Sequence, residues 1–499
     1  MPMDLRHDLI VESAYWTVIA TRSPKPENEK GIIMSPLTSP ITLFSSLFLC
    51  LPAMAFDSVP VDQWEWELSN ADAPWAARAG LQVVDIDGDF YLMGGRTPNA
   101  PGPVPIPGDS VIWSDVWKST DQGGAWNQLL ESDGDHWPAR AYFRAEAKGD
   151  QMFVMGGQNF ILIPNPECPP PYKNCSPFIS ASQFFNDVWS STDGVNWTQR
   201  TAEAGWSGRA GLSSAVMGDD LYVIAGSYLD DDAIIGGPPA RIYYNDVWKS
   251  SDDGETWTQM TEAAPFEPRA GAAVAVKDGY IYLFGGEEGF LCQDFPFCKP
   301  PYFNDVWRSA NGADWELVTA RAPWPSRPGH QVVVADDQFV LFGGFGQSAD
   351  PTDPFGAGNP MDVWVSSDGA DWQLASTSPW NATTPEEIKY DFAALAVDGS
   401  GDAESAIFTF GGDRETFDFS DPTNYLNIDN DVWRFAAPAA QPTCFGDIDG
   451  DGMVGVGDVF EILVAWGPCQ DCDADLSGNG RVGIIDFILV LIKWGPCPE

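Results

Sequence analysis

Oxygen-bearing side chains recur at a fixed spacing in two short loops near the C-terminal end of the sequence. In each loop they occupy positions 1, 3, 5 and 12, with a glycine at position 6. The first set is Asp447, Asp449, Asp451 and Asp458, and the second is Asp475, Ser477, Asn479 and Asp486. Such oxygens suit a hard cation, and position 7, Met453 or Arg481, adds its backbone carbonyl. The spacing therefore predicts two calcium sites, with Asp in place of the usual Glu at position 12.

Both loops belong to one duplicated unit, because 444–469 and 472–497 align residue for residue at a 28-residue offset. Each copy has an acidic loop, an apolar helical run and the tetrapeptide Trp-Gly-Pro-Cys. The loops are similar to EF-hand calcium loops, and the duplicated loop-helix unit resembles a dockerin. That resemblance implies a cohesin-like domain or a cell-surface component as partner. Val456-Gly457 and Ile484-Ile485 stand where many cellulosomal dockerins have a Ser/Thr pair, so the partner cohesin is left open.

The longer part of the chain is organised around a second repeat. Six copies of Asp-Val-Trp occur, at 115–117, 187–189, 246–248, 305–307, 362–364 and 431–433. An apolar run ending in Gly-Gly, degraded to Ala225-Gly226 in one copy, precedes each triplet, and a turn with a second Trp follows the first five. Each unit contains four short runs with strand-like alternation and β-branched or aromatic residues. The repeat predicts an all-β, six-bladed β-propeller of four-stranded blades, followed by a small all-α domain.

The sixth Asp-Val-Trp lacks a following Trp strand, and Trp64-Glu-Trp66-Glu-Leu68 near the chain start matches the missing one. We therefore expect this N-terminal strand to complete the last blade and close the ring. The Gly-Gly ends and the outer-strand Trp residues resemble kelch-type propellers over about 64–436. The turns ending at Trp126 and Trp257 resemble the Asp-box hairpins of sialidase-like propellers. Both resemblances imply a fold more than a chemistry, since one fold hosts many functions.

A cation recurs in the turn that enters each blade, mostly as Trp-x-x-Arg. The members are Arg78, Arg140, Arg209, Arg269 and Arg327, with Lys389 in the sixth blade. By symmetry they form a ring around one end of the propeller axis. Two interpretations stay open. Each cation pairs with a neighbouring blade's carboxylate, such as the Asp of Asp-Val-Trp, or the cations form an anion-binding mouth.

Side chains four and six residues after each cation share one face of the innermost strand, because strand side chains alternate. These positions are Gln82/Val84, Arg144/Glu146, Ser213/Ala215, Ala273/Ala275, Gln331/Val333 and Ala393/Leu395. The face is mostly small or polar, so we assign it to the central channel. Arg144 and Glu146 carry its only charges. We expect them to pair with each other; otherwise they are the best polar groups for a ligand or for acid–base work.

Cysteine placement and the chain start bear on the compartment. Of nine Cys, Cys168/Cys175 and Cys292/Cys298 form close pairs in equivalent loops, and four lie at the C-terminus. With only three His in the chain, paired cysteines indicate disulfides and an oxidising compartment. The apolar run 41–51, ending in Ala53-Met-Ala55, predicts a secretory signal and is too short for a membrane span.

Charge and domain organisation complete the expectation. The net charge of −46 and the pI of about 4.1 argue against nucleic acid or an anionic membrane as partner. We expect an N-terminal extension with signal peptide at 1–55, the propeller at 56–436, a linker at 437–443 and the calcium module at 444–499.

The sequence favours an exported, non-catalytic recognition protein. Its propeller would bind a carbohydrate or protein ligand, and its C-terminal module would attach it to a cohesin-bearing scaffold or the cell surface. The first alternative is a polysaccharide-degrading enzyme, a glycoside hydrolase or lyase, because dockerins often carry such enzymes. A glycosidase usually needs two carboxylates at a defined separation, and no motif for them is evident, so no catalytic residue is assigned. The second alternative is a structural cell-surface protein.

Overall fold

The computed structural model describes part of the chain. It covers residues 59–497 apart from 101–108, 133, 172–174, 176, 230–240, 290–300, 348–356, 359–360, 381–388, 400–404, 415–422, 439–444, 450–451, 470–471, 473 and 478. The predicted signal peptide, the Cys292/Cys298 pair, Asp451 and most of the predicted linker lie outside the described residues. No helix in the described part is long and apolar enough to cross a membrane.

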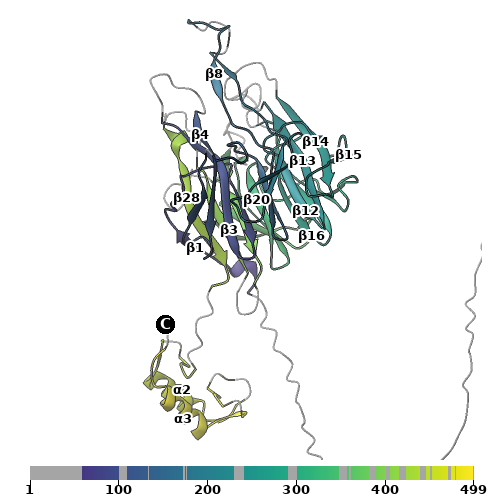
Figure 1. The fold of residues 1–499 in the computed structure, drawn as a ribbon. Helices are drawn as coiled ribbons and strands as arrows, with labels where there is room; N and C mark the ends of the chain where they lie inside the picture. Colours follow the sequence, from purple (N-terminus) through teal and green to yellow (C-terminus); the bar gives the residue numbers. More distant parts are fainter. Residues whose placement is uncertain are drawn as a thin grey trace, which may run out of the picture. The chain divides into compact units, whose positions relative to one another are not determined.

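Six four-stranded antiparallel sheets form a six-bladed propeller, as the repeat predicted (Figure 1). From the innermost strand outward, blade 1 is β2 (Gln82–Ile86), β3 (Asp89–Pro98), β4 (Ser110–Ser119) and β5 (Asn127–Leu130). Blade 2 is β6 (Arg144–Lys148), β7 (Gln151–Met155), β10 (Val188–Ser191) and β11 (Thr198–Thr201). Blade 3 is β12 (Ser213–Met217), β13 (Asp220–Tyr228), β14 (Ile242–Ser250) and β15 (Thr258–Thr261).

The remaining blades follow the same order. Blade 4 is β16 (Ala273–Lys277), β17 (Tyr280–Glu287), β18 (Tyr302–Ser309) and β19 (Glu316–Thr319). Blade 5 is β20 (His330–Ala335), β21 (Gln338–Gly343), β24 (Asp362–Ser366) and β25 (Gln373–Thr377). Blade 6 is β26 (Ala393–Val397), β27 (Ala406–Asp413), β28 (Ile428–Ala436) and, from the start of the chain, β1 (Glu65–Asn70).

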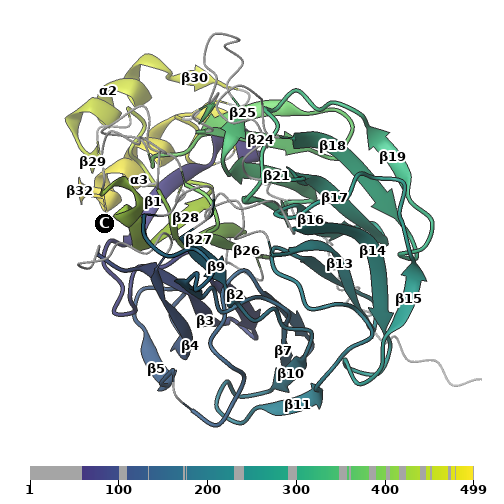
Figure 2. The same ribbon diagram turned by 90° about the horizontal axis from the view of Figure 1, so that it is seen from above.

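The ring closes through this N-terminal strand. β1 pairs antiparallel with β28, with Leu68 opposite Trp433, which confirms the predicted completion of the last blade. The innermost strands contact one another in circular order: β2, β6, β12, β16, β20, β26 and β2 again. Figure 2 shows these six sheets arranged around a common axis. Closure leaves each blade covered by a neighbour on both faces, which protects the sheets from edge-to-edge pairing.

The local sequence explains this packing. Second strands are continuous apolar runs because both faces of the blade are covered; Phe90, Leu92 and Met93 in β3 are fully buried. Four of these strands, β3, β13, β17 and β27, have a bulge at the Gly pair, where their register against the third strand shifts. Gly95 has φ of 101°, and a Cβ there would lie 2.9 Å from the carbonyl oxygen of Ala79. The second glycine therefore allows the strand to approach the turn that carries the blade cation.

The loop between the second and third strands of blade 2 carries its own hairpin. β8 (Leu162–Pro164) pairs with β9 (Phe178–Ser180), and Figure 1 shows β8 projecting beyond the six sheets. Cys168 and Cys175 form a disulfide in this loop, as predicted from their spacing. A shorter hairpin, β22 (Gly346–Gln347) with β23 (Ala357–Gly358), stands at the equivalent place in blade 5.

The C-terminal repeat forms a small module with two helices, α2 (Val456–Val464) and α3 (Ile484–Lys493). The short strand after each acidic loop pairs with the strand that follows the other copy's helix. β29 (Met453–Val454) pairs with β32 (Gly495–Pro496), and β31 (Arg481–Val482) pairs with β30 (Gly467–Pro468). The equivalent residues Ile462 and Val490 are fully buried in the module's core. Each copy thus completes the other, which explains why the sequence carries two.

Candidate functional site

The blade cations make buried ion pairs with the aspartates of Asp-Val-Trp. The shortest N–O distances are Arg78–Asp115 2.6 Å, Arg140–Asp187 2.8 Å, Arg209–Asp246 2.6 Å, Arg269–Asp305 2.6 Å, Arg327–Asp362 2.7 Å and Lys389–Asp431 2.5 Å. The pairing itself was predicted, but the aspartate belongs to the cation's own blade, not to a neighbouring one. The reason is topological: the turn before the first strand and the start of the third strand lie at the same end of one sheet.

These ion pairs explain why three motifs repeat together. Nη1 of Arg78 also donates to the carbonyl oxygen of Gly94, in the Gly-Gly pair, at 3.0 Å. Nε1 of Trp117 donates to Asp115 at 2.7 Å, so the tryptophan of the triplet orients the carboxylate. All six cations are buried. The alternative, an anion-binding mouth formed by these residues, stays a prediction; in the structure each cation is engaged by its blade's own aspartate.

Two residues beyond each cation, the backbones of the six blades join in a closed ring of hydrogen bonds. Each N–H donates to the preceding member's carbonyl at 2.7–3.0 Å, in the order Gly80, Tyr142, Gly211, Gly271, Gly329, Asp391 and back to Gly80. A bond from every blade to the next can form only around the common axis. All six residues have φ between 50° and 64°. Glycine is the ordinary residue for this conformation, so Tyr142 and Asp391 are exceptions that store strain at the axis.

Charged side chains surround these two exceptions. Arg96 and Asp413, each directly after a Gly-Gly pair, form an ion pair with 2.5 Å between Nη2 and Oδ2. Nε of Arg96 donates to the Tyr142 hydroxyl at 2.6 Å. Burial, reinforced by the nearby Asp413 carboxylate, raises the pKa of Asp391 to about 7, although Arg96 and Arg144 oppose the shift. Blades 6, 1 and 2 thus create a polar cluster on an otherwise pseudo-symmetric ring.

Arg144 and Glu146 lie on the axial side of β6, as expected, but they do not pair with each other. Nε of Arg144 donates to the carbonyl of Leu212 at 2.8 Å, and Nη2 donates to that of Ala272 at 3.3 Å. These carbonyls belong to the entries of blades 3 and 4, so the guanidinium reaches across the axis. Glu146 instead accepts a 2.5 Å hydrogen bond from the Ser214 hydroxyl. Burial raises the pKa of Glu146 above its usual range.

Arg96, Asp413, Tyr142 and Asp391 were not predicted as site residues from the sequence. A positional signal for them exists in the repeat alignment. Four blades carry Gly two residues after the cation, and the other two carry Tyr142 and Asp391. Likewise, the residue after the Gly pair is Arg96 in blade 1 and Asp413 in blade 6. At a position where one blade departs from the repeat, the structural role that the six blades share does not determine the residue.

In the first C-terminal loop, oxygens of Asp447, Asp449 and Asp458 lie within 4.8 Å of one another. Asp458 is fully buried and accepts backbone N–H bonds from Ile448, Asp449 and Gly455. Burial alone would raise the pKa of Asp458, but these N–H groups bring it below its usual range. A compact group of ionised carboxylates is the donor set that a calcium ion prefers. The residues present therefore fit such an ion.

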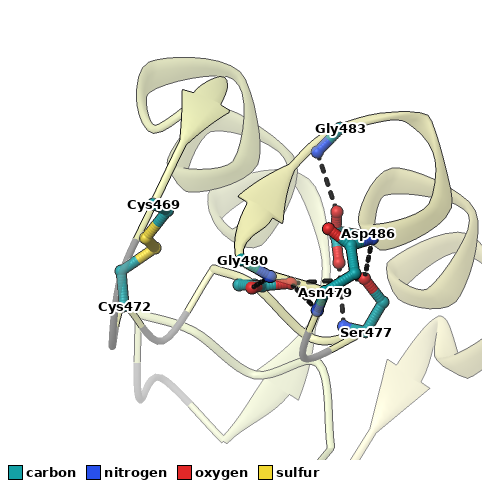
Figure 3. The surroundings of a disulfide bond; sticks show 8 residues. Cys469, Cys472, Ser477, Asn479, Gly480, Gly483 and Asp486 are labelled. Carbon is teal, nitrogen blue, oxygen red and sulfur yellow. Dashed lines mark hydrogen bonds between the residues drawn. A yellow bond between two sulfur atoms is a disulfide. The ribbon is translucent and has the colours of Figure 1, made fainter.

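The second loop has the same backbone arrangement with fewer charges (Figure 3). Asp475 accepts from the N–H of Gly480 at 2.7 Å, and Asp486 accepts from that of Gly483 at 2.7 Å. Ser477 and Asn479 supply neutral oxygens beside them, linked by a 2.6 Å hydrogen bond. Cys469 and Cys472 form a disulfide directly before this loop. Met453 and Arg481, the position 7 residues, lie in β29 and β31.

No protein-family model matches the chain. A stretch of 307 residues is 22% identical to the alpha chain of the flagellar outer-arm dynein of Chlamydomonas reinhardtii; it covers 57% of this chain but 6% of that protein. The solved structure of YjhT aligns with a TM-score of 0.49 and 14% identity, covering 73% of this chain and 96% of that chain. Neither likeness shows a family or an activity. The fold class rests on the six sheets described above.

Proposed function

We propose that this chain is an exported, non-catalytic recognition protein with two functional parts. The propeller binds a carbohydrate or protein ligand. The dockerin-like C-terminal module binds two calcium ions and attaches the protein to a cohesin-bearing scaffold or to the cell surface. The observation that carries the proposal is the convergence of the Asp447, Asp449 and Asp458 carboxylates in the first C-terminal loop. The disulfides support an oxidising, extracellular setting.

The two helices of the module support a docking role. Their outward faces are apolar at equivalent positions of the two copies: Val456/Ile484, Phe460/Ile488, Leu463/Leu491, Val464/Ile492 and Trp466/Trp494. Val464 is 81% exposed and Ile492 is 69% exposed. Contiguous exposed apolar surface of this kind marks an interaction site more often than a solvated face. The proposed occupant is a cohesin-like domain, as the dockerin resemblance implies.

The rival class, an enzyme that degrades polysaccharide, is supported less well. The carboxylates of the propeller's axial end are engaged within the fold: Asp413 pairs with Arg96, and Glu146 accepts from Ser214. A purely structural role gives no reason for two strained non-glycine residues at the axis. A recognition site at the axial end accounts for the charged side chains there and for the two strained residues.

Docking is tested with the full-length chain and a panel of purified, immobilised cohesin domains, in calcium and in chelator. Retention by at least one cohesin in calcium and release by chelator are expected. Val464→Ser with Ile492→Ser should abolish retention, because it removes apolar area from both helices. The control is Leu374→Ser, which changes an exposed apolar residue (59% exposed) in β25 of the propeller. Retention in chelator, or retention of the Val464→Ser, Ile492→Ser double variant, would overturn the docking proposal.

Ligand binding is tested separately. The full-length protein is applied to a glycan array, and the bound glycans are then incubated with it and analysed for cleavage. Binding without cleavage is the expected result. Cleavage products would move the protein to the enzyme class.

A further inference from the structure

Arg144 differs from the other cations near the axis because no carboxylate in the described part of the chain forms an ion pair with it. An arginine has five N–H donors, and two of those of Arg144 are used, by the carbonyls of Leu212 and Ala272. Among the described residues no ion pair involves Arg144, whereas all six blade cations and Arg96 have one. Within the residues that the structure describes, Nη1 of Arg144 has no hydrogen-bond partner, and the residue as a whole is partly exposed.

The surrounding protein destabilises the charge of the Arg144 guanidinium when no anion accompanies it. Burial lowers the pKa of Arg144, which means that the surrounding protein disfavours its charged form. Glu146 and Asp391 lie near enough to oppose this, but neither forms an ion pair with it. A partly buried guanidinium whose charge is incompletely balanced is stabilised by an anion that accepts two parallel N–H bonds. A carboxylate has the matching planar geometry.

We propose that the axial end of the propeller binds the carboxylate of a small acidic sugar, with the guanidinium of Arg144 as its principal contact. The inference rests on the proposed function, because it specifies the ligand class of the recognising propeller. A single carboxylate fits better than a polyanion, because the chain's net charge of −46 repels extended negative polymers at long range. The Tyr142 hydroxyl accepts from Nε of Arg96 and can still donate its own proton, and Gln331, whose Nε2 donates to the Phe392 carbonyl, still has its amide oxygen; both groups suit the hydroxyls of a sugar ring.

Asp391 sets the charge that an acidic ligand meets. The groups that act on its carboxyl are Arg96 from β3, Asp413 from β27 and Arg144 from β6. Below neutral pH Asp391 is protonated, so it does not repel a ligand carboxylate. It also does not compete with the ligand for the charge of Arg144. Above neutral pH the Asp391 carboxylate both repels the ligand and competes for Arg144. Affinity for an acidic sugar should therefore fall as the pH rises through about 7, the pKa of Asp391.

The test measures binding of D-glucuronate and D-galacturonate to the full-length protein by calorimetry, with D-glucose and D-galactose as neutral counterparts and lactate as a carboxylate without a ring. At least one uronate should bind, and more tightly than its neutral counterpart and than lactate. Arg144→Gln should weaken uronate binding about 10- to 100-fold, as expected for a lost charge-assisted bidentate contact. Arg200→Gln, which changes a surface arginine paired with Glu255, should not weaken it.

Further variants keep the test decisive. If Arg144→Gln does not fold, Arg144→Lys, which keeps the charge but not the planar fork, should still weaken binding. Asp391→Asn should retain uronate binding and remove its decline between pH 6 and pH 8. The inference is overturned if no uronate binds, if neutral sugars or lactate bind equally well, or if the Arg144 variants bind as the unchanged protein does. Glycan-array binding that is insensitive to Arg144 would overturn this inference while leaving the proposed function standing.

Discussion

Arg78 and Asp115, which lie 37 residues apart in the sequence, form a bidentate ion pair inside blade 1. Nη1–Oδ1 is 2.6 Å and Nη2–Oδ2 is 2.9 Å, and both side chains are buried. The same guanidinium holds the end of the second strand through the Gly94 carbonyl. One side chain therefore fixes three consecutive segments of a blade. The arrangement recurs with Arg in blades 1 to 5, whereas Lys389 in blade 6 contacts Asp429 and Asp431 instead.

Breaking this pair should be costly, because the remaining partner becomes a buried charge without compensation. Asp115→Ala should lower the free energy of unfolding by about 3–5 kcal/mol, measured by chemical denaturation. Asp371→Asn, which changes an exposed carboxylate in blade 5, serves as the control and should change it by less than about 0.5 kcal/mol. A similarly small effect of Asp115→Ala would show that the ion pair does not organise the blade.

Ring closure depends on the strand supplied by the start of the chain. Trp66 in β1 stacks on Phe435 with ring centroids 4.6 Å apart, and Trp64 is buried beside it. Deleting residues 60–70 should uncover blade 6, lower the melting temperature and broaden the unfolding transition, because the ring opens. Calorimetry of the deleted and complete chains measures both quantities. An unchanged transition would contradict closure by β1.

The raised pKa of Asp391 makes stability depend on pH. Because the folded-state pKa of about 7 lies above the ordinary value of 3.8, the folded protein favours the protonated form. The contribution of Asp391 to stability is thus fully present below about pH 4 and is lost as the pH rises to about 7. Asn tolerates the same backbone conformation and does not ionise. The free energy of unfolding of Asp391→Asn, relative to that of the unchanged protein, should therefore rise by on the order of 2 kcal/mol between pH 5 and pH 8. A pH-independent difference between the two unfolding curves would refute this assignment.

The axial ring should resist side chains at its glycine positions. At Gly329 φ is +64°, and a Cβ would lie 2.6 Å from Oδ1 of Asp391. Gly329→Ala should therefore cost about 1–3 kcal/mol through backbone strain and displacement of the carboxyl. Gly88→Ala is the matched control, because Gly88 also has positive φ but no atom within 4 Å of the added Cβ. Equal losses in the two variants would mean that the Asp391 contact contributes nothing.

The repeat made much of the propeller predictable. Spacing of Asp-Val-Trp gave six blades, and the similarity of Trp64-Glu-Trp66 to later strands gave the closure, because both are local patterns repeated along the chain. The axial cluster was not predicted. Arg96 and Asp413 lie 317 residues apart and meet only because the ring closes. Strand alternation placed Arg144 on the correct face but could not show that its guanidinium crosses to carbonyls of two other blades.

The calcium assignment is the central claim, and counting the bound ions tests it most directly. Calorimetric titration of the full-length, calcium-free chain should show two sites of unequal affinity. The first loop should be the tighter site, because it offers four carboxylates against two in the second. Asp447→Asn should weaken the tighter site and Asp475→Asn the weaker one, while Asp371→Asn should change neither. Two sites that respond separately to these variants are the predicted result; no binding at millimolar calcium, or binding unaffected by both loop variants, would contradict the account.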